Sequence, residues 1–480
     1  MAELTLPEDF ITQTKAITGD ELWQTMKEAL AKEPPVSIRM NSGKCTRMAP
    51  CEDIVEESVP WCKDAYYLKE RPNFTFDPLL HAGIYYVQEA SSMFLDTALR
   101  QYAGSEPVKM LDLCAAPGGK STVARSILPD GSLLVCNEPM RNRANILAEN
   151  IQKFGNPDVI VTNNFPADFK KARISFDIIL TDVPCSGEGM FRKDHNAIEE
   201  WSKANVDKCQ TLQKEIVESI WECLKPGGLL IYSTCTFNTK ENEENIRFIT
   251  EELGAEVLPV EADKSWNITG SLLPHLNMPV YRFLPGRTKG EGLFIAVLRK
   301  KNDGTEAHEH KNKSRRCNEN SKNTKSKKAT ELQWLIGGDD FIVHSHKEKI
   351  AAIPRHWNDI YEDICRSLNV IHAGVTIGEC KGKDVIPAQS LALSTRLNRN
   401  AFATSDIDYM QAISFLRKEA ITLPPETARG IVLITYNGFP LGFVKNLGNR
   451  ANNLYPAEWR IKSTHLPEGH NEILKENRDI

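Results

Sequence analysis

The stretch Leu111-Asp112-Leu113-Cys114-Ala115-Ala116-Pro117-Gly118-Gly119-Lys120-Ser121 decides the fold. It begins in the apolar run Val108–Cys114 and leads into a helical pattern over Lys120–Leu128. Small residues between a strand and a helix let the backbone come close to a ligand. The helix that follows presents free N–H groups at its first turn. The stretch therefore predicts a ligand-binding loop at the edge of an α/β sheet.

Working outward, residues 107–300 alternate apolar runs with amphipathic stretches. This alternation predicts βαβ units and a mostly parallel, Rossmann-like sheet. The expected strands are Val108–Cys114, Leu133–Asn137, Val159–Thr162, Phe176–Asp182, Leu229–Ser233 and Phe294–Leu298. The expected helices are Lys120–Leu128, Arg141–Phe154, Val206–Leu224 and Glu241–Leu253, with Lys225–Gly228 as a helix stop and turn.

Three classes of ligand compete for the loop. A dinucleotide fingerprint needs G-x-G-x-x-G, which the loop lacks, and a Walker loop needs glycine where Cys114 stands. S-adenosylmethionine needs a close backbone but no phosphate cradle, and an acid after the next strand, here Glu138, suits its ribose hydroxyls. We therefore expect this cofactor. The loop residues assigned to it are Cys114, Ala115, Ala116, Pro117, Gly118, Gly119 and Lys120.

Two further segments end the fourth and fifth expected strands. One carries Asp182 and Cys185, and the other carries Cys235. Ligands of open parallel sheets bind at the carboxyl ends of strands, so these side chains should share one crevice. A lone cysteine is more often a small buried hydrophobe, and we interpret Cys114, Cys136, Cys209 and Cys223 in that way. The positions of the two strand-end cysteines favour a reactive role instead.

Composition limits the class of protein. The 480 residues are 41% hydrophobic and 26% charged with a net charge of −5, which is typical of a globular protein of two to four domains. An RNA partner would require local positive charge. The twelve cysteines form no C-x-x-C pair, and no apolar run approaches the roughly 18 residues of a membrane span. We expect a reduced, cytoplasmic protein without a membrane segment; the histidine pairs 308/310 and 344/346 have no metal-site spacing.

The flanking segments suggest four further units. Residues 1–106 form a small N-terminal domain, with a helix over Glu8–Lys32, a strand over Val36–Met40 and a helix over Gln88–Tyr102. Residues 301–330 are basic, poor in apolar residues and expected to be a disordered linker. Two C-terminal units follow, 331–420 and 421–480. The second contains a hairpin, because Asn437-Gly438 separates Gly430–Tyr436 from Phe439–Val444.

Several motifs resemble one known family, the RNA cytosine-5 methyltransferases of the NOL1/NOP2/Sun type. The similarity is closest to the bacterial branch that acts on small-subunit ribosomal RNA (methyltransferase F type). The motifs that carry it are Ser37–Asn41, Tyr86–Met93, Ala115–Lys120, Asp182–Gly187, Arg192–Asp194, Ser233–Thr236, Gly290–Gly292 and, near the C-terminus, Gly442–Arg450. The resemblance implies a Rossmann-like methyltransferase core, the cofactor S-adenosylmethionine, and ribosomal RNA or a ribosomal subunit as partner.

It also implies roles for individual residues. Cys235 would be the nucleophile that adds to carbon 6 of cytosine, and Cys185 would help to eliminate the product. Asp182 would contact the cytosine near the cofactor, and Lys120 would line the site. The C-terminal unit would be a PUA-like RNA-binding module. Side chains there that suit RNA are Lys445, Arg450, Tyr455, Trp459, Arg460 and Lys462.

The chain departs from the family where relatives place an aspartate for the adenine amino group. The matching position is Phe165, with Asn164 and Asp168 as possible substitutes. Phenylalanine packs beside adenine but accepts no hydrogen bond, so we expect weaker cofactor binding. Three alternatives stay open: a transfer RNA substrate, a non-catalytic ribosome-assembly factor that binds RNA, and a DNA cytosine methyltransferase with Cys185 as nucleophile.

Overall fold

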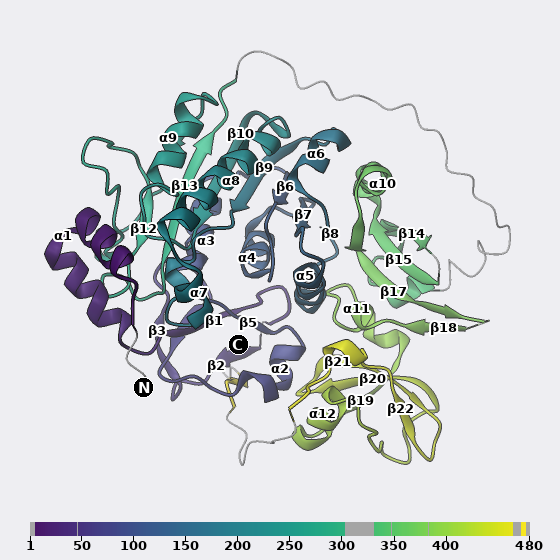
Figure 1. The fold of residues 1–480 in the computed structure, drawn as a ribbon. Helices are drawn as coiled ribbons and strands as arrows, with labels where there is room; N and C mark the ends of the chain where they lie inside the picture. Colours follow the sequence, from purple (N-terminus) through teal and green to yellow (C-terminus); the bar gives the residue numbers. More distant parts are fainter. Residues whose placement is uncertain are drawn as a thin grey trace.

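The computed structural model describes residues 5–45, 47–302, 331–346, 348–382, 384–463 and 472–476. A large sheet lies at its centre, with an N-terminal sheet below it and two C-terminal sheets to one side (Figure 1). Most of the expected linker 301–330, including His308 and His310, lies outside the described residues. Every helix in the described ranges is too short or too polar to cross a membrane.

The central sheet has nine strands in the order β11-β13-β10-β9-β6-β7-β8-β16, with β12 pairing β13. Its five inner strands are parallel, as predicted. They are β6 (Lys109–Asp112), β7 (Leu133–Asn137), β8 (Val159–Thr162), β9 (Phe176–Asp182) and β10 (Leu224–Thr234). The antiparallel strands are β11 (Glu256–Leu258), β12 (Tyr281–Phe283), β13 (Leu293–Arg299) and β16 (Val370–Ala373).

Helices cover both faces of this sheet, because neighbouring strand residues point to opposite sides. Met110 belongs to the core on one face and Leu111 to the core on the other. The first core includes α3 (Leu95–Tyr102), α4 (Gly119–Ile127) and α5 (Arg141–Phe154). The second includes α6 (Pro166–Ala172), α8 (Lys203–Trp221), α9 (Glu243–Glu251) and α10 (Asn358–Ser367). Both layers leave the carboxyl ends of the parallel strands free for a site.

One predicted turn lies inside a strand. The segment Lys225–Gly228 was expected to separate a helix from the next strand, but β10 starts at Leu224 and runs through it. The register with β9 shifts between Leu224 and Leu229, and Gly227 takes a φ of 77°. The glycine therefore forms a bulge, which the backbone of a non-glycine residue would resist.

The N-terminal unit combines a helix, α1 (Glu8–Leu30), with a four-stranded sheet in the order β3-β4-β1-β5. Its strands are β1 (Val36–Met40), β3 (Val55–Ser58), β4 (Ala65–Leu68) and β5 (Tyr85–Val87). The predicted helix over Gln88–Tyr102 is too long: α3 starts at Leu95, after a 3-10 turn. The reason is that the Gln88 N–H donates to Ser37 O at 3.2 Å, which continues the sheet.

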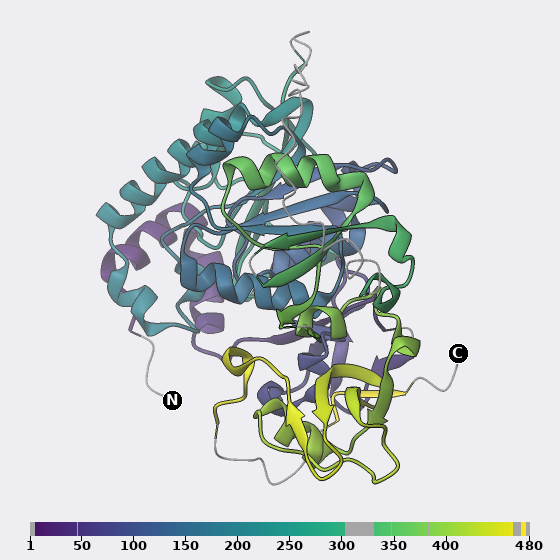
Figure 2. The same cartoon turned by 90° about the vertical axis from the view of Figure 1, so that its right-hand side faces the viewer.

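The C-terminal part contains two further four-stranded sheets, seen face-on in Figure 2. The first has β14 (Phe341–His346), β15 (Lys349–Pro354), β17 (Val375–Lys381) and β18 (Asp384–Pro387). The second has β19 (Ala403–Asp406), β20 (Gly430–Tyr436), β21 (Phe439–Asn446) and β22 (Ala451–Asn453), with α12 (Tyr409–Leu416) beside it. The predicted hairpin is present, and Asn437 and Gly438 both have positive φ at its turn.

Strand β16 lies between β15 and β17 in the sequence but joins the central sheet. It pairs antiparallel with β8, from Val370 beside Thr162 to Ala373 beside Ile160. Residues 331–420 were expected to form a separate unit, and they also complete the central sheet. The second C-terminal sheet shares a core with the N-terminal sheet, where Ile38 and Val444 are both buried. The C-terminal part is therefore packed against the rest of the chain.

Candidate active site

The two strand-end cysteines lie side by side. β9 and β10 are parallel neighbours with Asp182 in register with Ser233, so the segments that leave them turn into the same space. The Cys185 and Cys235 sulfur atoms are 3.2 Å apart. Their hydrogen bond, together with burial, raises the pKa of the Cys185 thiol well above its usual value. Cys185 therefore stays a protonated thiol in contact with the Cys235 sulfur.

A charged chain runs beside the thiols. The Lys120 Nζ lies 2.9 Å from Asp182 Oδ2, and the Ser233 hydroxyl donates to Asp182 Oδ1 at 2.7 Å. Burial works against the Lys120 ammonium, but the Asp182 carboxylate outweighs it and the pKa of Lys120 is raised. Asp182, Lys120, Cys185 and Cys235, the four residues singled out as catalytic candidates, thus lie in one cluster. The carboxylate is held between two donors.

Two buried glutamates position the loops that carry the cysteines, and the sequence analysis missed both. Glu241 is fully buried and accepts from the Ser186 N–H at 3.0 Å and from Gln213 Nε2 at 2.7 Å. Glu188 is 1% exposed and accepts the N–H groups of Phe237 and Asn238, two and three residues after Cys235. A carboxylate that accepts several backbone N–H groups fixes the path of a loop.

Close backbone contact joins the same two loops. The Gly189 N–H donates to Cys235 O at 2.7 Å, and a Cβ on Gly189 would lie 2.6 Å from that oxygen. The acid-glycine pair Glu188-Gly189, which follows Cys185-Ser186-Gly187, was the available signal for this contact. Only glycine lets the loop after β9 approach the Cys235 backbone so closely.

The predicted cofactor loop lies at the neighbouring strand, β6. Gly118 is the N-cap of α4 with φ 115°, a conformation that favours glycine, and a Cβ there would lie 3.3 Å from Leu147 Cδ1. The Ser121 hydroxyl donates to Asp112 Oδ2 at 2.7 Å and ties the helix start to the end of β6. Burial raises the pKa of Asp112 to about 7 and also raises that of Cys114. The loop therefore presents backbone rather than charged side chains.

Glu138 ends β7 next to this loop. It is 1% exposed, and its Oε1 accepts from the Met140 N–H at 3.0 Å. Its Oε2 has no hydrogen-bond partner among the described residues, although Arg143 Nη1 lies 3.4 Å away. A buried carboxylate oxygen that accepts no hydrogen bond retains the capacity to accept one from a ligand hydroxyl.

Phe165 follows β8 and is 66% exposed, which is unusual for a large apolar side chain. Neither proposed substitute for the missing aspartate is free. Asn164 Oδ1 accepts the Asn369 N–H at 2.9 Å, and Asp168 Oδ2 accepts the Phe165 N–H at 3.1 Å. The exposed ring is thus the group that this segment offers to a ligand.

One residue expected on an RNA surface is in the core instead. Tyr455 is fully buried, and its ring packs 5.4 Å from that of Phe415. Trp459 is half-buried, with Lys153 Nζ 5.6 Å above its ring. Arg450, Arg460 and Lys462 are exposed. The basic side chains of this cluster are therefore accessible, but its tyrosine supports the fold rather than a base.

Comparisons with known families match three parts of the chain. Residues 102–299 match the model of the 16S rRNA methyltransferase RsmB/F. Residues 6–90 match the N-terminal domain of 16S rRNA methyltransferase RsmF, and residues 402–461 match the methyltransferase RsmF PUA domain. The expected architecture, a methyltransferase core with an N-terminal domain and a C-terminal PUA module, is confirmed.

Full-length relatives agree. The ribosomal RNA small subunit methyltransferase F of Citrobacter koseri is 30% identical over 83% of this chain and 84% of its own length. The ribosomal RNA small subunit methyltransferase F of Shewanella oneidensis is 30% identical over 88% of this chain and 90% of its own length. A methyltransferase homologue of known structure from Pyrococcus horikoshii is 27% identical with a TM-score of 0.51, over 62% of this chain and 96% of that one. The chain therefore belongs to the RsmB/F family of methyltransferases.

Proposed function

We propose that this chain methylates carbon 5 of a cytosine in small-subunit ribosomal RNA, with S-adenosylmethionine as methyl donor and Cys235 as nucleophile. The observation that carries the proposal is the pair of sulfur atoms 3.2 Å apart, on loops that leave adjacent parallel strands beside the Lys120–Asp182 pair. The names of the full-length relatives support the choice of RNA. The PUA module supports an RNA partner of some kind.

The cofactor fits the residues beside the thiols. Glu138 Oε2, which accepts no hydrogen bond among the described residues, suits a ribose hydroxyl. The backbone around Gly118 and Gly119 allows close approach, and the exposed Phe165 ring suits the flat adenine. Asp182 lies at the end of β9, between this loop and the cysteines. When bound, S-adenosylmethionine supplies an electrophilic methyl group on a sulfonium.

The chemistry assigned to the chain begins with the Cys235 thiol, which loses its proton to solvent and bonds as a thiolate to carbon 6 of the cytosine. The electrons of the C5–C6 double bond then become available at carbon 5, which takes the methyl group. Asp182, held by Lys120 and Ser233, contacts the polar edge of the base and positions it. Loss of the carbon 5 proton to solvent re-forms the double bond and expels the Cys235 sulfur.

Cys185 acts on the last of these steps. Its raised pKa keeps it protonated, and its sulfur already lies 3.2 Å from the Cys235 sulfur. A donor at this position stabilises the negative charge that returns to the Cys235 sulfur as the C6–S bond breaks. Cys185 therefore favours release of the methylated product, whereas Cys235 makes and breaks the bond.

Replacing Phe165 with aspartate should tighten cofactor binding about tenfold, because one hydrogen bond to a charged group is worth roughly 1.5–3 kcal/mol. The neighbouring oxygens of Asn164 and Asp168 already have partners, so a new acceptor would not duplicate them. Calorimetric titration with S-adenosylmethionine measures the effect. Phe165→Leu is the control, since it adds no acceptor and should not tighten binding. An unchanged affinity for Phe165→Asp would show that adenine lies elsewhere.

The test of the proposed function is a methylation assay with three substrates. Small ribosomal subunits, free small-subunit RNA and transfer RNA are each incubated with the full chain and S-adenosylmethionine, and their nucleosides are analysed by mass spectrometry. We expect 5-methylcytidine in the subunit or its RNA. The same product in transfer RNA alone would overturn the choice of substrate. Binding to RNA without any methylated nucleoside would favour an assembly factor.

A further inference from the structure

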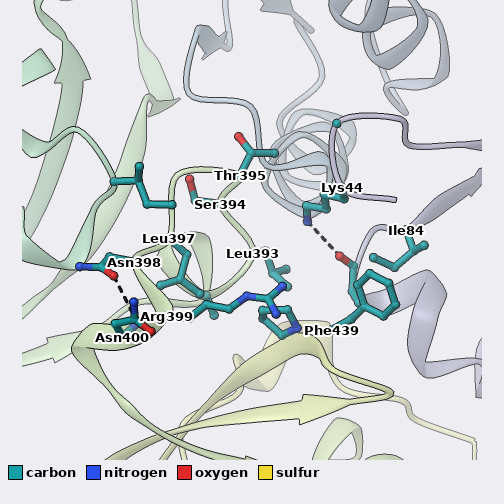
Figure 3. A pocket seen from close by; sticks show the side chains of 15 residues that line it. Lys44, Ile84, Leu393, Ser394, Thr395, Leu397, Asn398, Arg399, Asn400 and Phe439 are labelled. Carbon is teal, nitrogen blue, oxygen red and sulfur yellow. Dashed lines mark hydrogen bonds between the residues drawn. The ribbon is translucent and has the colours of Figure 1, made fainter. Parts of the chain in front are cut away.

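A cavity of about 400 Å³ lies where three separate parts of the chain meet (Figure 3). One wall comes from the N-terminal unit, with Lys44 after β1 and Ile84 before β5. Another comes from the segment 392–400, between the two C-terminal sheets, and the third from Phe439 at the start of β21. None of its lining residues belongs to the cluster around the thiols or to the cofactor loop.

The cavity is positively charged. Lys44 and Arg399 line it, whereas no acidic side chain does. Among the described residues, neither cation lies within 4.0 Å of a carboxylate. Each donates hydrogen bonds to backbone oxygens. Lys44 Nζ donates to Ala82 O at 2.9 Å and to Lys153 O at 2.5 Å, and Arg399 Nη1 donates to Gly438 O at 2.8 Å. Both retain unused N–H groups.

Burial and nearby positive charge lower the pKa values of both side chains. Burial, and then the charge of Arg399, lowers the pKa of Lys44 to about 7. Burial, and then Arg47, lowers the pKa of Arg399. Two cations that face one cavity without a counter-charge are stabilised by a bound anion, which would raise both pKa values again.

The rest of the lining suits a base and a sugar. Ile84, Leu393 and Phe439 provide apolar surface, and Asn398 and Asn400 also line the cavity (Figure 3). The Asn398 amide already bonds to Gln333 O and to the Asn400 N–H, so the Asn400 side chain is the amide offered to a base. The volume falls within the range of small-ligand sites, roughly 300–1,000 Å³. Single-stranded RNA is bound through apolar or aromatic contact with bases, hydrogen bonds to their edges, and cations on phosphates.

We propose that this cavity binds one phosphate-bearing nucleotide of the substrate RNA, apart from the cytosine that is methylated. The inference rests on the proposed function and adds a second point of attachment to it. Helix α5 links the two sites: its first turn follows Glu138, and Lys44 binds the carbonyl of Lys153 in its last turn. α5 has fourteen residues, so at 1.5 Å per residue it is about 21 Å long. A nucleotide held there fixes which cytosine reaches the thiols.

The test compares Arg399→Gln with Arg366→Gln in the full chain. Arg366 is an exposed arginine on α10 that pairs with Asp363 of the same helix at 3.0 Å, so its loss removes equal charge at another place. Binding of a labelled single-stranded RNA containing the methylated region is measured by anisotropy over a range of salt concentrations. Arg399→Gln should bind roughly tenfold more weakly than the wild type. The negative slope of log K against log salt should become shallower by about 0.7. Arg366→Gln should match the wild type.

A second variant fills the cavity without removing charge. Asn400 is exposed at the rim, so Asn400→Trp should also weaken RNA binding while it leaves cofactor affinity unchanged. Wild-type affinity and salt slope in both Arg399→Gln and Asn400→Trp would overturn the cavity site and leave the proposed function intact. A wild-type chain that neither binds nor methylates RNA would overturn both.

Discussion

Replacing Cys185 with alanine is expected to leave the protein covalently attached to its RNA, whereas replacing Cys235 is expected to abolish attachment. The reason is the division of roles across the 3.2 Å sulfur contact. Without the Cys185 donor, the Cys235–carbon 6 bond still forms but breaks slowly. Without Cys235 no bond forms, and methylation should fall by about 10⁴-fold or more, as for other lost nucleophiles. A denaturing gel separates the attached complex from free protein.

Cys209→Ala is the matched control for this experiment. Cys209 is a half-buried cysteine on α8, outside the sulfur pair, so its loss should change neither attachment nor turnover. A complex that accumulates with Cys235→Ala would reverse the roles and favour the arrangement of DNA cytosine methyltransferases. If the wild type methylates RNA and neither variant forms a complex, the covalent mechanism is wrong.

The central sheet was predictable from local patterns. β7, β8, β9 and α5 have the same bounds in the sequence analysis and in the structure. Fully buried parallel strands are short apolar runs, and the helices between them have one apolar face, so each element carries its own signal. The meeting of Cys185 and Cys235 followed from the same reasoning, because carboxyl ends of parallel strands share one edge.

Features that depend on distant segments carried no such signal. β16 pairs with β8, which lies about two hundred residues earlier in the chain. A strand of only four residues does not indicate from its own sequence which sheet it joins. Glu188 and Glu241 were not singled out from the sequence, because the N–H groups that they accept lie about fifty residues away. Tyr455 was expected on an RNA surface, but it is buried against Phe415 of α12. The sequence near Tyr455 does not show that this distant helix covers it.

The second large effect, a loss of stability, is expected when the buried carboxylate of Glu188 is replaced by an amide. Its Oε2 accepts the N–H groups of Phe237 at 2.6 Å and Asn238 at 3.0 Å, and its Oε1 accepts Trp201 Nε1 and Asn238 Nδ2, each at 3.1 Å. All four partners are donors, so the amide of Glu188→Gln must turn an N–H group towards other donors. We expect a cost of about 3–5 kcal/mol, since a buried charged network loses partners.

Calorimetry of the full chain should show that cost as a fall of roughly 10 °C in the melting transition of the catalytic part. The loop after Cys235 should also shift, so kcat should fall at temperatures where the variant is still folded, while cofactor affinity stays unchanged. Glu251→Gln, an exposed acid at the end of α9, is the control for the loss of one negative charge. A variant that is destabilised but keeps full kcat would mean that Glu188 supports the fold without positioning the nucleophile. Loss of kcat with an unchanged melting temperature would instead mean that Glu188 positions the loop without stabilising the fold.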